Sequence, residues 1–343
     1  MYLKALSEGN RICMQRQLTF GGGGVSPRNT RLRGQSIIEY VLIIAVIGLV
    51  IVFAGPGVAG AIRNQFNLVG NTLNSGTNGG TEDGGASGGG STGADSATVQ
   101  AAVAKDAKDW TLDEQKAVAE DIAAKGEASP AWAKAEAAMD AGTTFSLKLT
   151  NGKTLTYRII GMNHDDLTDG SGKAGLTFLT TSTGIRSRMN AERTNVGGWE
   201  NSELRQKMNS GEIWNLMPSD FQSKVKPVTK LTNNLDGKTK DATVTATSDK
   251  LFLLSYSEIV KTPWSGWSAY SWIGKEGTQY EAFKGKVSGN SSSSYLYLGE
   301  AWWERSAHPR DTEEFIEVDT WGGPDSSCYA TNESRCVCPA WCF

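Results

Sequence analysis

The sequence predicts an α+β protein that has an N-terminal transmembrane α-helix, a flexible linker and a loop-rich outer domain preceded by a short helical pair. Three observations lead to this prediction. An uncharged apolar run spans residues 40–62, a stretch rich in Gly and Ser spans residues 74–97, and short strand patterns begin at Thr143. Short strands with a few peripheral helices and many Gly, Asn and Ser loops are typical of the α+β class.

The apolar run is long enough to cross a membrane. At about 1.5 Å per residue, a helix over residues 40–62 spans roughly 35 Å, against a bilayer hydrocarbon core of ~30 Å. Residues 1–34 carry six basic residues and one acid, so the positive-inside bias keeps this leader in the cytoplasm. We therefore expect a single-pass membrane protein with an extracellular C-terminal domain.

One acid, Glu39, lies at the start of the apolar run, five residues after Gly34. A carboxylate at the bilayer centre costs on the order of 2–3 kcal/mol, and intramembrane acids usually have a partner. If the chain is cut between Gly34 and Gln35, the new amino group lies about one helical turn from Glu39. That amine can neutralise the carboxylate within one chain or between packed chains.

The N-terminal region resembles the type IVb (Flp/Tad) prepilins. The resemblance rests on Gly34, on Glu39-Tyr40 before an aliphatic helix, and on the sequence FNLVGNTL at residues 66–73. It implies that a prepilin peptidase removes residues 1–34, that residues 35–73 form a transmembrane pilin helix, and that Glu39 guides assembly with other pilin subunits. Flp pilins are tiny, whereas this chain continues well beyond residue 73. The alternative is a plain anchor that stays in the lipid bilayer and never polymerises.

Charge excludes one class of partner. Without the leader, the chain has 28 Lys and Arg against 36 Asp and Glu. An acidic chain of this kind is not expected to bind nucleic acid or anionic lipid.

The linker at residues 74–97 behaves as a flexible coil with a reach of roughly 25–30 Å. Residues 98–142 are rich in Ala and contain two short helical patterns, the first opened by a capping box from Thr111 to Glu114. Two helices of about three turns need a partner surface, so we expect this pair to pack on the outer domain at residues 143–343.

The outer domain begins with a predicted hairpin around Asn151-Gly152, because alternating residues flank this turn dipeptide. Further strands are expected at residues 175–181, 225–231, 251–256, 295–298, 301–305, 314–318 and 335–340, and short helices at 202–208 and 218–224.

Residues 98–343 resemble an uncharacterised family of bacterial surface domains, domain-of-unknown-function family 6273. The fragments that carry this resemblance are IIGMNHDD at 159–166, KAGLTF at 173–178, WENSELR at 199–205, KLFLLS at 250–255, WWERS at 302–306 and CPAWCF at 338–343. The family is distantly similar to the C-type-lectin-like and formylglycine-generating-enzyme fold group. That similarity implies a loop-rich domain that displays ligand-binding loops.

Aromatic residues gather in one Gly- and Ser-rich stretch, where Trp264, Trp267, Tyr270 and Trp272 precede Gly274. Exposed rings there can bind a glycan or a protein surface. The alternative is that these rings anchor the loop in the core.

A second candidate is the oxygen-rich loop that contains Asp165, Asp166 and Asp169. Its carboxylates are a candidate Ca²⁺ site, although the spacing does not match an EF-hand. The alternative is a polar turn with local hydrogen bonds.

Four cysteines lie near the C-terminus, at Cys328, Cys336, Cys338 and Cys342. An even number in an exported domain indicates disulfides, with three pairings open. We prefer Cys328–Cys336 with Cys338–Cys342, because Cys336 and Cys338 would lie on one face of a strand. Metal binding by this cluster is the alternative.

Signals for an enzyme are few. Two His residues, His164 and His308, occur in the whole chain, and no nucleophile elbow or phosphate loop is present. We therefore expect a binding protein without a required cofactor rather than a secreted thiol or metal enzyme.

Overall fold

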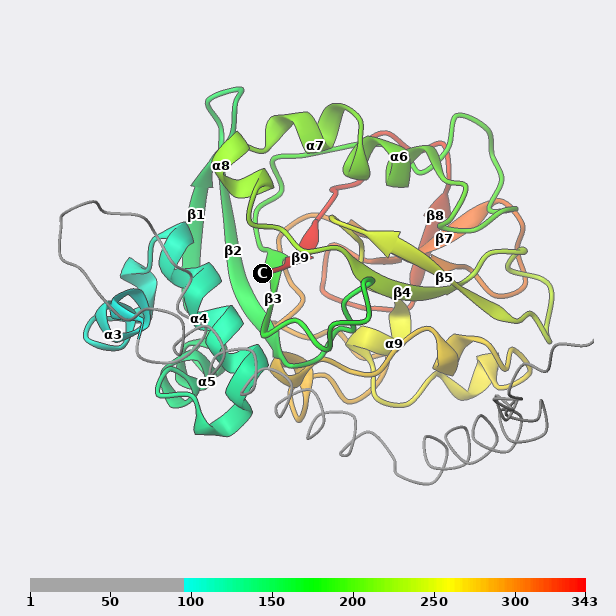
Figure 1. Cartoon of the computed structure of the whole chain (residues 1–343). Coiled ribbons are helices and arrows are strands. Elements are labelled where there is room, and N and C mark those ends of the chain that lie inside the picture. The colour runs from blue at the N-terminus through cyan, green and yellow to red at the C-terminus, as the bar shows by residue number, and fades with distance from the viewer. Residues whose placement is uncertain (1–95) are drawn as a thin grey trace, which may run out of the picture. The chain divides into compact units, whose positions relative to one another are not determined.

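The computed structural model describes residues 96–343 (Figure 1). Gly34, Gln35, Glu39 and Tyr40 lie outside the described residues, as do the predicted membrane helix and residues 74–95 of the predicted linker. The last two residues of that linker instead begin a helix, with Ser96 as its N-cap and Ala97 as its first residue. Within residues 96–343, no helix is long and apolar enough to cross a membrane. This part of the chain mixes helices with antiparallel sheets, so the predicted α+β class is confirmed for it.

Three helices come first: α3 (Ala97–Val103), α4 (Leu112–Lys125) and α5 (Trp132–Asp140). The predicted capping box is confirmed, because the Thr111 side chain accepts from the Glu114 N–H while the Glu114 carboxylate accepts from the Thr111 N–H. Figure 1 shows these helices (cyan to green) gathered beside β1 and β2. Helix α4 packs so tightly that a Cβ on Gly175 would lie 1.8 Å from the carbonyl oxygen of Ala119.

The central sheet has the order β1-β2-β3-β9, with every pair antiparallel. Its strands are β1 (Thr144–Lys148), β2 (Thr154–Met162), β3 (Leu176–Thr180) and β9 (Ala340–Cys342). The predicted β1–β2 hairpin is confirmed, and Gly152 takes the positive φ of 81° that its turn requires. Strand β9 brings the C-terminal end of the chain into the middle of the fold (Figure 1).

Two smaller sheets complete the fold. One pairs β4 (Val228–Asn233) with β5 (Val244–Asp249), and the other has the order β6 (Trp302–Ala307), β7 (Glu314–Val318) and β8 (Ser326–Tyr329). The remaining α-helices are α6 (Glu203–Asn209), α7 (Glu212–Leu216), α8 (Ser219–Gln222) and α9 (Tyr256–Ile259). Single 3₁₀ turns occupy Ala107–Asp109, Gly126–Ala128, Ser265–Trp267, Ile273–Lys275 and Glu281–Phe283.

Three predicted strands are wrong. The strand expected at residues 335–340 is absent, because Cys336 makes only isolated β-bridges and β9 does not begin until Ala340. Residues 251–256 are buried, but only Phe252 makes a β-bridge, to Ala340. Ser255 instead caps helix α9, because its side chain and that of Glu258 form a capping box. Residues 295–298 form a turn rather than a strand.

An aromatic cluster fills the core between the central sheet and helix α8. The rings of Tyr157 and Trp341 are 4.8 Å apart, those of Phe221 and Trp341 5.1 Å, and those of Phe178 and Phe343 5.3 Å. These side chains are almost completely buried. The last residues of the chain therefore belong to the core.

Candidate functional site

The aromatic stretch before Gly274 does not present a continuous binding face. Trp267, Tyr270 and Trp272 are only 2%, 9% and 0% exposed. Trp267 packs edge-on against Tyr256 at 5.0 Å between ring centroids, and the Trp272 indole N–H donates to the Thr239 carbonyl at 2.9 Å. The loop has few other large apolar side chains, so its rings serve as anchors. For these three residues the prediction of a ligand-binding surface is wrong.

Trp264 is the one member of that group with a substantially open ring, at 43% exposed. Its indole lies over Gly266, where a Cβ would approach the ring to 2.7 Å. The Arg310 guanidinium lies 5.8 Å from the ring centroid and also donates to the Gly266 carbonyl. Trp264 is thus held in place at the surface.

Sequence analysis missed three more exposed aromatic residues. Tyr329 is 42% exposed, with the Arg193 guanidinium 3.2 Å from its ring centroid. The other two, which we call the aromatic pair, are Tyr297, 55% exposed, and Trp321, 74% exposed. They lie on loops that touch. The Ser293 N–H donates to the Gly322 carbonyl at 3.0 Å, and a Cβ on Gly322 would lie 2.3 Å from the Ser293 carbonyl oxygen. The two loops are therefore held together by backbone contacts that leave no space for a side chain at Gly322.

The turn that carries Trp321 is built by Asp319. One carboxylate oxygen accepts the N–H groups of Trp321 at 2.7 Å and Gly323 at 2.8 Å. The sequence Asp-Thr-Trp-Gly-Gly at residues 319–323 was the available signal, since it indicates a turn with no apolar neighbour to cover the indole. Tyr297 had no such signal, because it was assigned to a strand.

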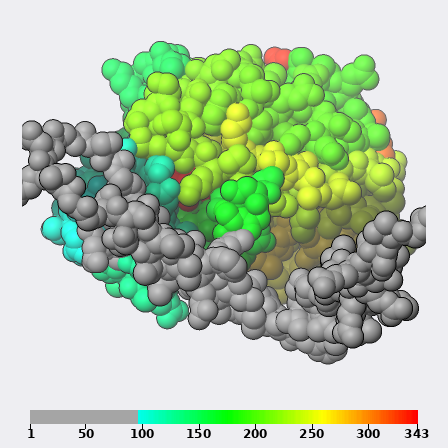
Figure 2. All heavy atoms as spheres, viewed as in Figure 1, coloured from blue at the N-terminus to red at the C-terminus, as the bar shows by residue number. Residues whose placement is uncertain are grey.

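The structure does not bring Asp165, Asp166 and Asp169 together. Asp165 points inward to Lys230, whereas Asp166 forms an exposed ion pair with Lys173 at 2.9 Å. Asp169 accepts the Ser171 N–H at 2.8 Å in a local turn. The loop stands out on one face of the molecule (bright green in Figure 2). Across residues 96–343, no group of three His, Cys, Asp or Glu side chains is arranged to hold a metal ion.

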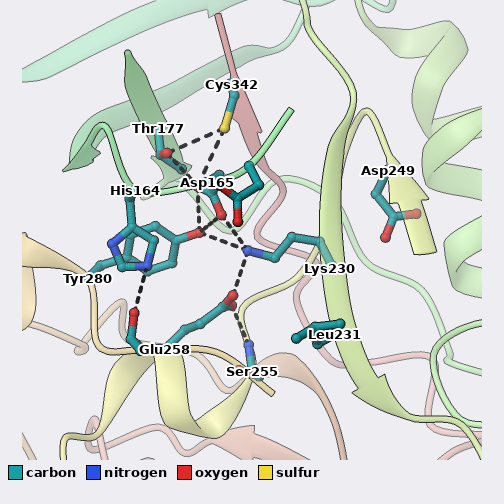
Figure 3. Close-up of polar contacts among 12 residues, drawn as sticks. His164, Asp165, Thr177, Lys230, Leu231, Asp249, Ser255, Glu258, Tyr280 and Cys342 are labelled. Atoms are coloured by element: carbon teal, nitrogen blue, oxygen red, sulfur yellow. Dashed lines mark hydrogen bonds and ion pairs between the residues drawn. The ribbon is translucent and has the colours of Figure 1, made fainter. Parts of the chain in front are cut away.

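Asp165 instead belongs to a buried charge network with Lys230, Glu258 and Arg305. Figure 3 shows side chains from distant parts of the sequence converging on Lys230. Its ammonium lies 2.7 Å from Asp165 and 2.5 Å from Glu258, and Arg305 donates two further bonds to Glu258. All four side chains are at most 3% exposed.

Burial disfavours the charged forms of the four side chains in this network, but the attraction between their opposite charges outweighs that effect. Desolvation works to raise the pKa of Asp165, yet the charge of Lys230 holds that pKa well below its usual range. Desolvation likewise opposes the raised pKa of Lys230, which its two acidic partners maintain. Two acids and two bases are therefore ionised and balanced.

Two further acids at the edge of this network behave differently. Burial raises the pKa of Glu276 to about 7. Burial also raises the pKa of Glu304 well above its ordinary value, and neither of its oxygens has a hydrogen-bond partner among the described residues. Every charged member of the network is buried, and its ion pairs join α9, β4 and β6 through Glu258, Lys230 and Arg305.

The structure contradicts the predicted disulfides, because Cys328, Cys336, Cys338 and Cys342 are all free and buried thiols. Cys328 lies in β8, whereas Cys336 bridges to Trp302. Cys342 faces Thr177, with 3.3 Å between its sulfur and the hydroxyl. Burial raises the pKa of all four thiols.

Comparison with known proteins gives one match. The model of a family described as a domain of unknown function (DUF6273) matches residues 174–342, which extend from just before β3 into β9. The match supports the expected similarity over these residues and leaves α3–α5, β1 and β2 outside it. No curated protein and no solved structure matches the chain.

Proposed function

We propose that this chain is a pilin-like cell-surface protein, a minor pilin or tip adhesin of a Tad-type pilus, that displays residues 96–343 as a ligand-binding domain. One observation carries the proposal. Gly34 directly precedes an uncharged apolar run that has a single acid, Glu39, at its start. A secretory signal peptide has its cleavage site after the apolar core, whereas a cut at Gly34 leaves the membrane helix on the mature chain.

The Gly- and Ser-rich residues 74–97 support display of the domain away from the filament. A coil of this length reaches roughly 25–30 Å. We further propose that the domain has a C-type-lectin-like fold, in which long loops present the binding surface. The long loop region between β5 and β6 supports this relation, because it holds α9 and three 3₁₀ turns but no strand.

The aromatic pair is the proposed binding face, and a glycan is the proposed ligand. Exposed indole and phenol rings offer flat apolar faces for sugar rings with a polar edge beside them. Tyr297 and Trp321 sit on loops that hydrogen bonds to backbone carbonyls and to the Asp319 carboxylate already hold, so little loop ordering remains to oppose binding.

Binding rather than catalysis is supported by the burial of the reactive groups. The charge network is closed to solvent, and thiols with raised pKa values contain little of the nucleophilic thiolate. Both features suit a rigid scaffold.

The test is the mass of the mature protein. Intact-mass analysis of membrane-extracted chain from cells with a working prepilin peptidase should give an N-terminus at Gln35, and Gly34→Ala should slow the cut. An uncut leader in those cells, or a cut after the apolar run, would overturn the proposal.

A membrane-anchored domain that never polymerises is the alternative. Glu39→Ala separates the two, because it removes a carboxylate that opposes membrane insertion but pairs with a neighbouring subunit in a filament. In a pilin, the variant should be depleted from sheared surface fractions and retained in membranes. Equal amounts of wild type and variant in the sheared fraction would favour the simple anchor.

A further inference from the structure

A hollow of about 520 Å³ opens between helix α9 and the segment from Gly274 to Gly285. Its polar lining comes from Ser257, Lys261, Thr278, Gln279 and Lys284, and Pro263 and three glycines complete it. This volume lies within the range of small-molecule sites, roughly 300–1,000 Å³.

The charge of the lining is one-sided. Lys261 and Lys284 contribute two ammonium groups, and no Asp or Glu is among the described residues that line the hollow. Lys261 is exposed and forms no hydrogen bond or ion pair with any described residue. Lys284 has one ion pair, 3.0 Å from Glu281. The hollow therefore contains positive charge that the protein does not fully neutralise.

The walls of the hollow are rigid. The Gln279 side-chain amide donates to the carbonyls of Ile259 at 2.9 Å, Phe283 at 3.3 Å and Val287 at 2.7 Å, which ties three segments together. A Cβ on Gly277 would lie 2.5 Å from the Glu258 side chain, so this wall rests directly on the buried charge network. A site with walls of this kind keeps its shape when empty.

We propose that this hollow binds the carboxylate of an acidic sugar, with Lys261 and Lys284 as the charged contacts and the Thr278 hydroxyl as a neutral donor. The choice of a sugar as carrier rests on the proposed function; the choice of an anion rests on the lining alone. The segment after Lys284 also leads toward the aromatic pair, since the Ser293 hydroxyl donates to the Lys286 carbonyl at 3.2 Å.

Glu281 competes with such a ligand. Its carboxylate holds Lys284 on one side and His164 on the other, 3.1 Å from the imidazole Nδ1. Glu281→Gln removes this internal anion and should tighten binding. If the two lysines had only a structural role, Glu281→Gln would not tighten binding.

The experiment is calorimetric titration of the detergent-solubilised full chain with a hyaluronan tetrasaccharide, which carries glucuronate carboxylates. Lys261→Gln and Lys284→Gln should each weaken binding about tenfold, as expected for the loss of one charge-assisted hydrogen bond. Lys148→Gln is the matched control, because Lys148 is an exposed lysine on β1. It should change nothing. The same tetrasaccharide with its carboxylates reduced to alcohols should bind more weakly than the acidic form.

Absence of binding, equal binding of acidic and reduced sugars, or equal losses in Lys148→Gln and Lys261→Gln would each overturn the inference. Melting curves of every variant separate lost binding from unfolding. A correctly processed chain that does not bind contradicts this inference alone, whereas an unprocessed chain that binds contradicts the proposed function alone.

Discussion

The ammonium group of Lys230 lies 2.7 Å from a carboxylate oxygen of Asp165, and both side chains are 3% exposed. This pair joins the loop after β2 to strand β4, and Glu258 extends it to helix α9. Two charges withdrawn from water are tolerated because each is paired and hydrogen-bonded. The wall of the proposed anion site rests on this network through Gly277, so the network also positions a surface feature.

Lys230→Met should destabilise the folded protein by about 3–5 kcal/mol, the usual cost of leaving a buried charge without its partner. Urea unfolding followed by tryptophan fluorescence measures the change. Lys173→Met is the matched control, since Lys173 pairs with Asp166 at 2.9 Å while both side chains remain exposed. It should cost under about 1 kcal/mol. Similar losses in the two variants would contradict the role assigned to the buried pair.

Glu276 should make stability depend on pH. Burial raises its pKa in the folded state from 4.5 to about 7. The folded chain therefore binds this proton more tightly than the unfolded chain. The stabilising contribution is complete below about pH 4.5 and is lost as the pH rises to about 7.

Glu276→Gln isolates this effect, because the amide stays neutral at every pH. Relative to wild type, the variant should gain ~3 kcal/mol of stability between pH 4.5 and pH 7.5, on about 1.4 kcal/mol per unit of pKa shift. Taking the difference between the two proteins removes the opposite trend of carboxylates such as Asp165, whose pKa is lowered. Parallel stability curves across this range would show that Glu276 ionises normally.

Local sequence signals predicted the elements that depend on local chemistry. The capping box at Thr111, the Asn151-Gly152 hairpin and strand β7 are set by neighbours a few residues away, and the structure has all three. Strand β5 was missed because its sequence VTATSD is polar and mostly exposed. It forms through pairing with β4, which no local pattern encodes.

The site was harder to predict because burial is decided by distant contacts. Trp264 and Trp267 are three residues apart in one loop, yet one is 43% and the other 2% exposed. Trp267 is covered by Tyr256 and His308, which the sequence cannot place beside it. Asp165 and Asp166 are adjacent in the loop after β2, but Asp165 turns inward only because Lys230 is there to receive it.

The free thiols lead to a chemical prediction. A native chain treated with a thiol reagent at pH 8 should react slowly, because Cys338 and Cys342 are buried and burial raises their pKa values well above the usual range. After denaturation, four thiols should titrate in the chain that begins at Gln35. Two or fewer titrating thiols would show that disulfides form in the mature protein.

Two tryptophan substitutions should separate core from surface. Trp267→Ala removes a buried indole and should cost about 3–5 kcal/mol of stability. Trp321→Ala removes an indole that is 74% exposed and should change stability by less than about 0.5 kcal/mol. If the aromatic pair binds sugar, Trp321→Ala should nevertheless lower retention of the protein on glycan arrays or target cells by about tenfold. Binding that survives Trp321→Ala and Tyr297→Ala together, with the fold intact by thermal melting, would place the binding face elsewhere on the domain.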